Sequence, residues 1–139
     1  MFNTFIAMNI SYRTDLIHDT LQIIELYNNA GLPRPTTDID RIGKMYENSN
    51  LIVSAWDQDL LVGVSRSITD WVWSCYLADL AVRADYQGMG IGKKLIELTK
   101  EKIGNQSTIM LLSVPTAMDY YPKIGMEAID NGFIIKRKE

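Results

Sequence analysis

The apolar positions at the start of the chain follow first the period of a strand and then that of a helix. Residues 5–12 form a short apolar run that predicts a first strand. The apolar side chains after it recur at the three-and-four spacing of an amphipathic helix. They are Leu16, Ile17, Leu21, Ile24 and Tyr27. We expect this helix to end at Gly31, because glycine readily closes a helix.

A proline-rich loop separates this helix from a second one. Pro33 and Pro35 block a helix in residues 31–35, since proline lacks the amide hydrogen and restricts the residue before it. Thr36 or Thr37 is then expected to cap the second helix through its side-chain oxygen. One side of that helix is apolar and carries Ile39, Ile42, Met45 and Tyr46.

From position 50 the apolar pattern becomes that of strands. Residues 51–56 and 60–67 are β-branched or apolar runs, and the polar residues 57–59 join them, which is typical of a hairpin. A third run, residues 71–82, follows a turn at residues 69 and 70. The pattern therefore predicts three antiparallel strands in a meander.

A helix and a further strand follow the meander. Ile91, Leu95, Leu98 and Lys102 keep helical spacing, and Gly104 ends that helix. The remaining pattern predicts a buried strand at residues 108–114, a short helix at 117–124 and a last strand at 133–136. A meander that leads into a β-α-β crossover gives a mixed sheet with helices packed on it, so we expect an α/β (α+β) fold.

Composition and charge narrow the class of protein. With 139 residues, 47% hydrophobic and 22% charged, and no repeat or long linker, residues 1–139 are expected to form one globular domain. The formal net charge of −3 favours neither nucleic acid nor an anionic membrane as a partner.

The sequence indicates neither a metal site nor a targeting segment. One cysteine and one histidine cannot build a zinc site of the usual kind, so we expect a metal-free protein. Neither a signal peptide nor a membrane span is indicated, so we expect a cytoplasmic protein.

A glycine cluster at residues 83–92 lies between the third meander strand and the next helix. Glycines let backbone amides approach a ligand, and a helix start adds unpaired donors, so this turn predicts an anion-binding cradle. The alternative is a tight connection that needs glycine only for its backbone angles. A phosphate loop of the Walker type is excluded, because Gln87 and Lys94 stand where it needs glycine and Ser or Thr. A dinucleotide fingerprint is excluded because Lys93 stands where it needs a small residue.

The same residues resemble a known family. The order Gln87, Gly88, Met89, Gly90, Ile91, Gly92 resembles the acyl-CoA signature Gln/Arg-x-x-Gly-x-Gly/Ala of the GNAT superfamily of N-acetyltransferases. Leu80, Ala81 and Val82 are similar to the strand that precedes this loop in the family. Residues 117–126 are similar to its A-x-x-F-Y-x-x-x-G-F helix and turn.

This resemblance implies that acetyl-CoA binds where two parallel strands splay apart. The strand backbone would pair with the pantetheine arm and polarise the thioester carbonyl, and the turn amides would hold the pyrophosphate. The implied cofactor-binding residues are Leu80, Ala81, Val82, Gln87, Gly88, Met89, Gly90, Ile91, Gly92 and Lys93. The implied activity is direct transfer of an acetyl group, in a ternary complex, to a primary amine of a small molecule or a protein. Members of the family often form homodimers.

The resemblance also implies roles for individual side chains. Tyr121 occupies the position of the family's general acid, against the alternative of a helix aromatic that only packs. Asp79 is a candidate general base, with a structural strand carboxylate as an equal alternative. Strand alternation puts Trp73 and Asp79 on one face and Tyr76 on the other, and a bulge of the kind common in the family would exchange the faces locally. Tyr76 is therefore a candidate for lining the substrate site, and Trp73 for walling the acceptor pocket.

Two departures from the family pattern affect the acceptor side. Val114 replaces an asparagine that often contacts the cofactor arm, and the segment after Gly125 is short for a long final hairpin. The loop at residues 33–35 is expected on the acceptor side by analogy alone. Two alternatives to an enzyme stay open at this point: a non-catalytic acyl-CoA-binding sensor, and a binder of another nucleotide.

Overall fold

The computed structural model of the chain describes residues 9–15 and 19–139. Residues 5–8, half of the predicted first strand, and Leu16 and Ile17 of the predicted first helix therefore lie outside the described residues. The first described strand, β1, is Ser11–Arg13. Among the described residues, no helix is long and apolar enough to cross a membrane.

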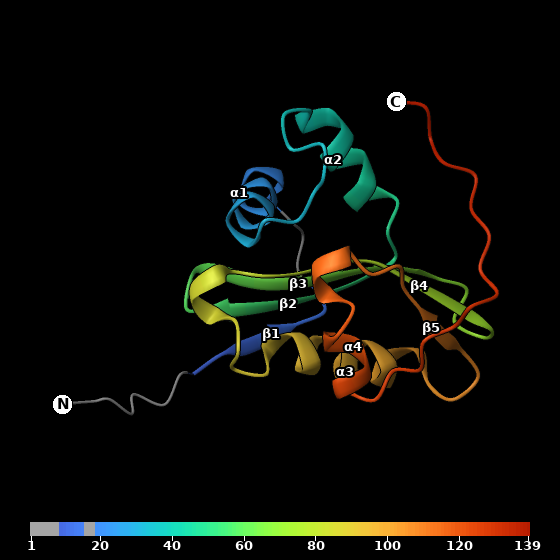
Figure 1. Ribbon diagram of the computed structural model, residues 1–139. Coiled ribbons are helices and arrows are strands. Elements are labelled where there is room, and N and C mark those ends of the chain that lie inside the picture. The colour runs from blue at the N-terminus through green and yellow to red at the C-terminus, as the bar shows by residue number, and fades with distance from the viewer. Residues whose placement is uncertain (1–8, 16–18) are drawn as a thin grey trace.

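Five strands form one mixed sheet in the order β1-β2-β3-β4-β5 (Figure 1). β2 (Leu51–Asp57), β3 (Leu60–Thr69) and β4 (Ser74–Val82) form the predicted antiparallel meander. β5 (Thr108–Met110) pairs in parallel with β4 after a helical crossover. The mixed α/β fold and its strand order are thus confirmed, because alternating apolar runs and turn residues are local signals that a sheet preserves.

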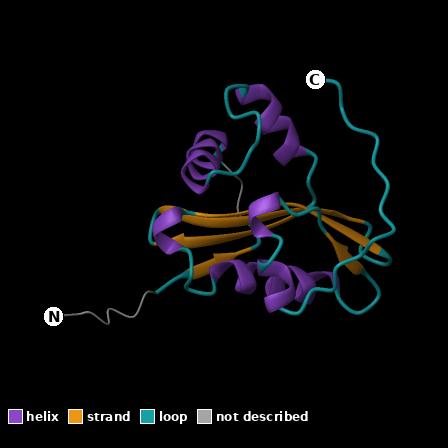
Figure 2. Ribbon diagram, in the orientation of Figure 1, coloured by secondary structure: helices purple, strands orange, loops and turns teal. Residues whose placement is uncertain are grey.

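Helices cover both faces of the sheet (Figures 1 and 2). α1 (Thr20–Ala30) and α2 (Ile39–Glu47) lie on one face, and α3 (Ile91–Ile103) lies on the other with α4 (Tyr120–Lys123) beside it. Two short 3-10 turns, Ala84–Tyr86 and Pro115–Ala117, precede α3 and α4. The predicted helix at residues 117–124 is therefore divided between a 3-10 turn and a single helical turn.

Aspartates cap the two helices on the first face. The Asp19 carboxylate accepts from the amide of Leu21, and the Asp38 carboxylate accepts from the amide of Arg41. The prediction of Thr36 or Thr37 as the cap of α2 was wrong. Both threonines precede the cap, and the Thr36 hydroxyl donates to the Asn28 side chain instead.

Each face of the sheet has its own hydrophobic core. The core under α1 and α2 contains Ile23, Leu26, Tyr27, Ile42, Ile52, Trp56, Leu61, Val64 and Ala81. The core under α3 contains Leu51, Val53, Ala55, Val62, Cys75, Ile91, Leu95 and Ile103. α3 thus fixes the glycine turn to the sheet, since Ile91, the first residue of the helix, is 3% exposed.

A bulge in β4 exchanges the faces of its side chains. Arg66 of β3 lies opposite Asp79, but the next residue, Ser67, lies opposite Leu77, so Ala78 has no partner on β3. Cys75 consequently belongs to the core under α3, whereas Asp79 hydrogen-bonds to Tyr27 of α1. Unbroken alternation would have put both on one face.

The strands near the end of the chain differ from the prediction. β5 ends at Met110 rather than Val114 and is partly exposed, because its pairing with β4 stops just before the bulge. The predicted strand at residues 133–136 is absent from this part of the described chain. Residues 127–139 instead leave the sheet, and a strand requires a neighbour that this path does not supply.

Candidate active site

The parallel strands β4 and β5 separate beyond three paired positions, of which Tyr76 and Met110 are the last. A pocket lies where they diverge, with a volume of about 70 Å³, well below the roughly 300–1,000 Å³ of drug-sized sites. This pocket admits a narrow group rather than a whole bulky ligand. Its lining residues are Leu32, Arg34, Leu77, Ala78, Leu80, Leu111, Leu112, Val114, Ala117 and Tyr121.

Tyr121 contributes its side chain to a lining whose other residues are mostly apolar in type. Burial raises the pKa of Tyr121, and the charge of the neighbouring Tyr120 raises it further. The side chain therefore keeps its proton at neutral pH and can donate it. The two tyrosine rings meet edge to face, with centroids 5.2 Å apart.

Tyr120 anchors α4 to the start of α3. A Cβ atom added at Gly92 would lie 2.7 Å from the Tyr120 Oη atom, so only glycine fits there without displacing that ring. This contact joins the two motifs that the sequence analysis singled out. It places Tyr121 beside the pocket while Tyr120 lies over the first turn of α3.

The glycine turn presents a row of free amides at the start of α3. Gly88 and Gly90 have φ angles of 80° and 82°, which glycine adopts without strain. The first helical hydrogen bond runs from the Lys94 amide to the Gly90 carbonyl. Within the described part of the chain, the amides of residues 88–93 meet no acceptor, so they point donors and the positive end of the helix dipole outward. An added Cβ at either glycine meets nothing within 4 Å, so the space before these amides is open.

Gln87 supports the turn rather than contributing a free amide. Its amide donates to the Ala84 carbonyl at 3.3 Å, and its side-chain nitrogen donates to the Val82 carbonyl at 2.9 Å. The Ala84 amide is itself held by the Asn29 side chain at 2.8 Å. These bonds fix the path of the turn from β4 to α3.

The backbone of β4 opens toward the pocket beyond its paired region. The Arg83 amide donates to the Val62 carbonyl of β3, so alternation along the strand turns the backbone groups of Val82 and Leu80 to the opposite edge. The Leu80 side chain lines the pocket, whereas Ala81 faces the core under α1. Leu80 and Val82 thus present peptide groups along the same edge as the free amides of the turn.

Asp79 lies at the centre of a buried ion-pair cluster, with its side chain fully buried. Its carboxylate accepts from the Tyr27 hydroxyl at 2.7 Å, from Arg34 Nε at 2.6 Å and from Arg66 Nε at 2.7 Å. Burial acts to raise the pKa of Asp79, but the hydrogen bond and charge of Arg66, the Tyr27 hydroxyl and the charge of Arg34 outweigh it and lower the pKa. The carboxylate is therefore ionised and fully paired.

This pairing favours the structural alternative for Asp79 over a catalytic base. A carboxylate held by two guanidinium groups is a weak proton acceptor, and its side chain points toward α1 rather than into the pocket. Arg34 connects the two regions, because it lines the pocket and also donates to the Ala78 carbonyl at the bulge, at 2.9 Å. The loop at residues 33–35 thus contributes Arg34 to the pocket lining, and its role on the acceptor side stays a prediction.

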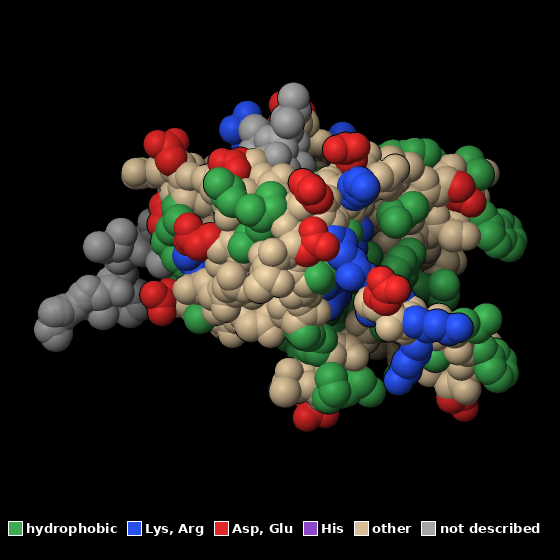
Figure 3. Space-filling model, turned by 90° about the horizontal axis from the view of Figure 1, so that it is seen from above, with side chains coloured by type: hydrophobic (Ala, Val, Ile, Leu, Met, Phe, Trp, Pro, Cys, Tyr) green, Lys and Arg blue, Asp and Glu red, His purple; other side chains and the backbone are tan. Residues whose placement is uncertain are grey.

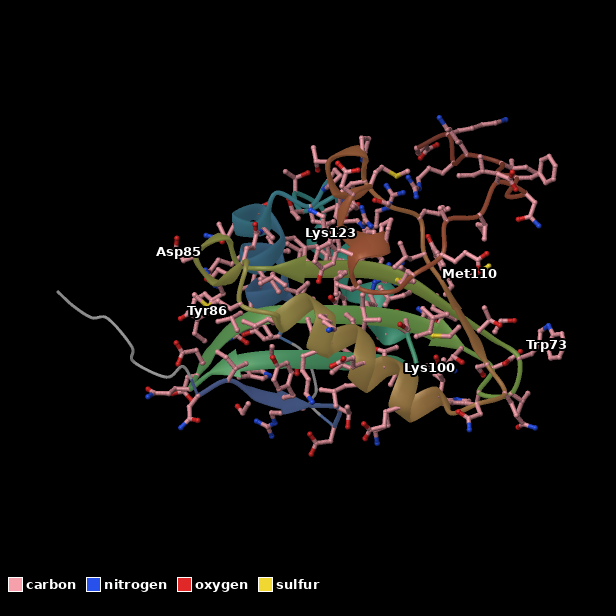
Figure 4. All side chains as sticks on the ribbon, turned by 60° about the horizontal axis from the view of Figure 1, so that its bottom comes forward. Trp73, Asp85, Tyr86, Lys100, Met110 and Lys123 are labelled. Carbon is pink, nitrogen blue, oxygen red and sulfur yellow. The ribbon has the colours of Figure 1, made fainter. Side chains whose placement is uncertain are left out.

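Trp73 and Tyr76 lie at the other end of β4. Figure 4 shows Trp73 in the turn between β3 and β4, at the opposite end of the sheet from Asp85 and Tyr86 of the glycine turn. Trp73 is 75% exposed, and Tyr76 is 41% exposed beside Met110. Neither residue is part of the pocket lining.

The structure also adds lining residues that the sequence did not indicate. These are Leu32 before the proline loop and Leu111 and Leu112 after β5, whereas Val114 and Ala117 lie where the family resemblance already pointed. Their apolar character alone predicts burial in a core, and only the divergence of the strands turns them toward a pocket. Among the described residues, no group of three or more His, Cys, Asp and Glu side chains is placed to hold a metal ion.

A protein-family model and several curated proteins are similar to this chain in sequence. Residues 35–136 match the family model described as an acetyltransferase (GNAT) domain. The uncharacterized ycf52-like N-acetyltransferase of Prochlorococcus marinus is 27% identical over 77% of this chain and 62% of its own length. Histone acetyltransferase TAP1 of Glycine max is 27% identical over 82% of this chain and 54% of its own length. The chain thus spans little more than half the length of these curated relatives.

Solved structures share the fold over most of the chain. A protein of unknown function from meticillin-resistant Staphylococcus aureus superposes with a TM-score of 0.79 and 26% identity, covering 93% of this chain and all of that one. A GNAT-family acetyltransferase from Streptococcus pneumoniae superposes with a TM-score of 0.77 and 23% identity, covering 94% of this chain and all of that one. The family model spans most of the chain, including the glycine turn and Tyr121, and the chain therefore belongs to the GNAT family of acetyltransferases.

Proposed function

We propose that residues 1–139 form an acetyl-CoA-dependent N-acetyltransferase domain that transfers an acetyl group to a primary amine of a small molecule or a protein. The observation that carries this proposal is the continuity of two features along one edge of β4. The free amides of residues 88–93 lie just beyond its C-terminal end, and the pocket with Tyr121 lies beside its middle. A long, thin ligand with a diphosphate and a reactive acyl end matches that layout.

The turn supplies what a diphosphate needs. Amides of residues 88–93 donate to its oxygens, the dipole of α3 favours its charge, and exposed Lys93 adds a cation at the rim. The Leu80 carbonyl and the Val82 amide are turned to pair with the pantetheine arm, whereas the Val82 carbonyl already accepts from the Gln87 side chain. The thioester then lies in the pocket between the strands, where a backbone amide of β4 polarises its carbonyl.

The transfer is a direct attack on the thioester. The neutral amine nitrogen forms a bond to the carbonyl carbon, the carbon–sulfur bond breaks, and the thiolate of CoA leaves. The Tyr121 hydroxyl donates a proton to the departing sulfur, and the attacking nitrogen loses its extra proton to water. Holding amine and thioester together in a narrow pocket supplies proximity.

The pocket itself favours the neutral form of the amine. Most of its lining residues are apolar in type, but the lining also exposes polar atoms, and its charged side chain is the guanidinium of Arg34. The positive charge of Arg34 disfavours an ammonium ion and lowers the pKa of a bound amine from its usual value near 10. We therefore assign deprotonation to this environment and to water, and a positioning role to Asp79, which fixes Arg34 through the 2.6 Å ion pair.

Calorimetric titration with acetyl-CoA, ATP and NAD tests donor binding. We expect heat of association with acetyl-CoA alone, and preferential binding of ATP or NAD would contradict the proposal. Detection of free CoA over a panel of polyamines, aminoglycosides, amino acids, arylamines and peptides then tests turnover. Binding of acetyl-CoA without CoA release from any amine would instead support the alternative function, a non-catalytic acyl-CoA sensor.

The cytoplasmic location stays a prediction. A similar protein from Arabidopsis thaliana, 34% identical over 52% of this chain and 29% of its own length, is named a chloroplastic N-acetyltransferase. Fractionation of the source cells with an antibody to this chain would test the prediction.

A further inference from the structure

The pocket between β4 and β5 is lined by residues from both faces of the sheet. Leu32 and Arg34 belong to the loop between α1 and α2, which lie on one face, and Tyr121 belongs to α4, which lies beside α3 on the other. The free amides proposed to hold the donor lie at the start of α3. A second substrate that enters the pocket from the side of α1 and α2 therefore passes Arg34.

The buried ion-pair cluster beside the pocket has more positive than negative charge. The guanidinium groups of Arg34 and Arg66 each carry one positive charge, and the Asp79 carboxylate that pairs with both carries one negative charge. In the part of the chain that the structure describes, neither arginine forms an ion pair with a second carboxylate. Burial raises the pKa values of Tyr27 and Tyr46, so both phenols stay neutral and offset none of this charge.

Arg34 is the charged residue of this cluster that lines the pocket. Its side chain is 24% exposed, against 10% for Arg66 and none for Asp79. Its Nη1 atom donates to the Pro33 carbonyl at 2.7 Å, and its Nη2 atom donates to the Ala78 carbonyl at 2.9 Å. Each of these nitrogens carries two hydrogens, so two N–H donors have no acceptor among the described residues. A guanidinium with unused donors at a pocket is suited to bind a carboxylate.

The acyl donor does not require this charge. Its phosphates are assigned to the free amides of residues 88–93, beyond the C-terminal end of β4, and its thioester is uncharged. Figure 3 views the molecule from the side of α1 and α2 and shows Lys and Arg side chains gathered near the middle of this face. A polyamine or an aminoglycoside carries further ammonium groups, which the charge of Arg34 would repel. The charge therefore favours an acceptor with a negative group.

We propose that the acceptor is an amine that also carries a carboxylate, and that Arg34 binds this carboxylate. Arg34 and Tyr121 line one pocket of about 70 Å³, so an amine at the thioester and a carboxylate at Arg34 lie close together. The two groups are then only a few bonds apart in the acceptor, as they are in a free amino acid. This inference rests on the proposed function and names the substrate class for it.

Kinetics with matched acceptors test the proposal. Release of CoA is measured for amino acids and for their carboxamides, which keep the amine and lose the negative charge. We expect kcat/KM to be about ten-fold higher for the acids, because hydrogen bonds to charged groups are strong. Arg34→Gln should remove this ratio, and Arg34→Lys should restore part of it. A purely structural role for Arg34 would lower both values of kcat/KM and leave their ratio unchanged, which would overturn the proposal.

Arg41→Gln is the matched control. Arg41 lies in α2 on the same face of the sheet, but it is not part of the pocket lining. The variant should keep the ratio of the unmodified protein. Equal kcat/KM for acids and carboxamides in the unmodified protein would overturn the proposal. Faster transfer from succinyl-CoA than from acetyl-CoA, lost in Arg34→Gln, would place the carboxylate on the acyl group and also overturn it.

Calorimetric titration separates this inference from the proposed activity. The acids and the carboxamides are titrated into the protein with and without CoA, so that no transfer occurs. We expect the acids to bind about ten-fold more tightly, and Arg34→Gln to abolish the difference. Tighter binding of acids without CoA release from acetyl-CoA would support the carboxylate site and contradict the activity. Release of CoA with no preference for acids, in kinetics or in binding, would support the activity and overturn the carboxylate site.

Discussion

A single substitution at Tyr121 tests whether its hydroxyl acts as the general acid. Replacing it with Phe removes the hydroxyl and retains the ring in the pocket lining. General acid catalysis contributes roughly 10²–10⁴-fold, so we expect kcat to fall by about 100-fold while acetyl-CoA affinity stays within about two-fold. Steady-state kinetics and calorimetry measure the two effects separately. Tyr12→Phe on β1, far from the pocket, is the control and should leave both unchanged, and equal kcat for Tyr121→Phe and the unmodified protein would remove the assignment.

Some residues of the site can be predicted from the sequence, and others cannot. The glycine turn and Tyr121 lie in short motifs, so neighbouring residues along the chain already define them. The pairing of Arg34 with Asp79 joins positions 45 residues apart, and nothing local marks either one as a partner. The sequence could therefore offer two roles for Asp79 but could not choose between them.

At the scale of elements, the packing of α4 on α3 depends on the missing side chain of Gly92. Gly92→Ala places a Cβ atom 2.7 Å from the Tyr120 Oη atom, and α4 must shift to relieve the contact. Overpacking of this kind costs about 1–3 kcal/mol. We expect Gly92→Ala to lower both the free energy of unfolding, measured in urea, and kcat, because Tyr121 moves with α4.

The second substitution Tyr120→Phe should reverse the effect of Gly92→Ala. It removes the hydroxyl, and the next atom of the ring, Cζ, lies 3.5 Å from the added Cβ, an ordinary contact distance. The double variant should therefore regain most of the lost stability and activity, while Tyr120→Phe alone changes them little. A double variant no better than Gly92→Ala would show that the contact does not set the position of α4.

The elements were predicted well where a periodic pattern fixes them and poorly where pairing decides. α3 and the meander follow their apolar spacing closely. β5 is shorter than residues 108–114 because the bulge at Ala78 separates it from β4, and a bulge depends on the partner strand. The same reasoning applies to residues 133–136, whose strand pattern finds no pairing partner among the described residues.

At the scale of the whole molecule, the Asp79 cluster connects α1, the proline loop and the sheet. Tyr27, Arg34 and Arg66 come from three separate segments and meet on one carboxylate. Removing one partner of a buried ion pair leaves uncompensated charge, which typically costs 3–5 kcal/mol. We expect Asp79→Asn to lower the free energy of unfolding by about 3 kcal/mol at pH 7, because the neutral amide leaves both arginines unpaired.

The cluster also predicts how stability depends on pH. The pKa of Asp79 is lowered in the folded protein, so between that value and the ordinary pKa of about 3.9 the unfolded chain binds more protons than the folded one. Acidification therefore favours unfolding. The ionised Asp79 carboxylate stabilises the fold fully at pH values above its pKa in the unfolded chain. This stabilisation is lost as the pH falls through the pKa of Asp79 in the folded protein. At pH 7 the unmodified protein should unfold at a higher urea concentration than Asp79→Asn. At pH 3 the difference between the two urea midpoints should be smaller. Glu97 is exposed, so the control Glu97→Gln should have the urea midpoint of the unmodified protein at both pH values. If the midpoint difference between the unmodified protein and Asp79→Asn were the same at pH 7 and pH 3, the charge of the Asp79 carboxylate would not stabilise the fold.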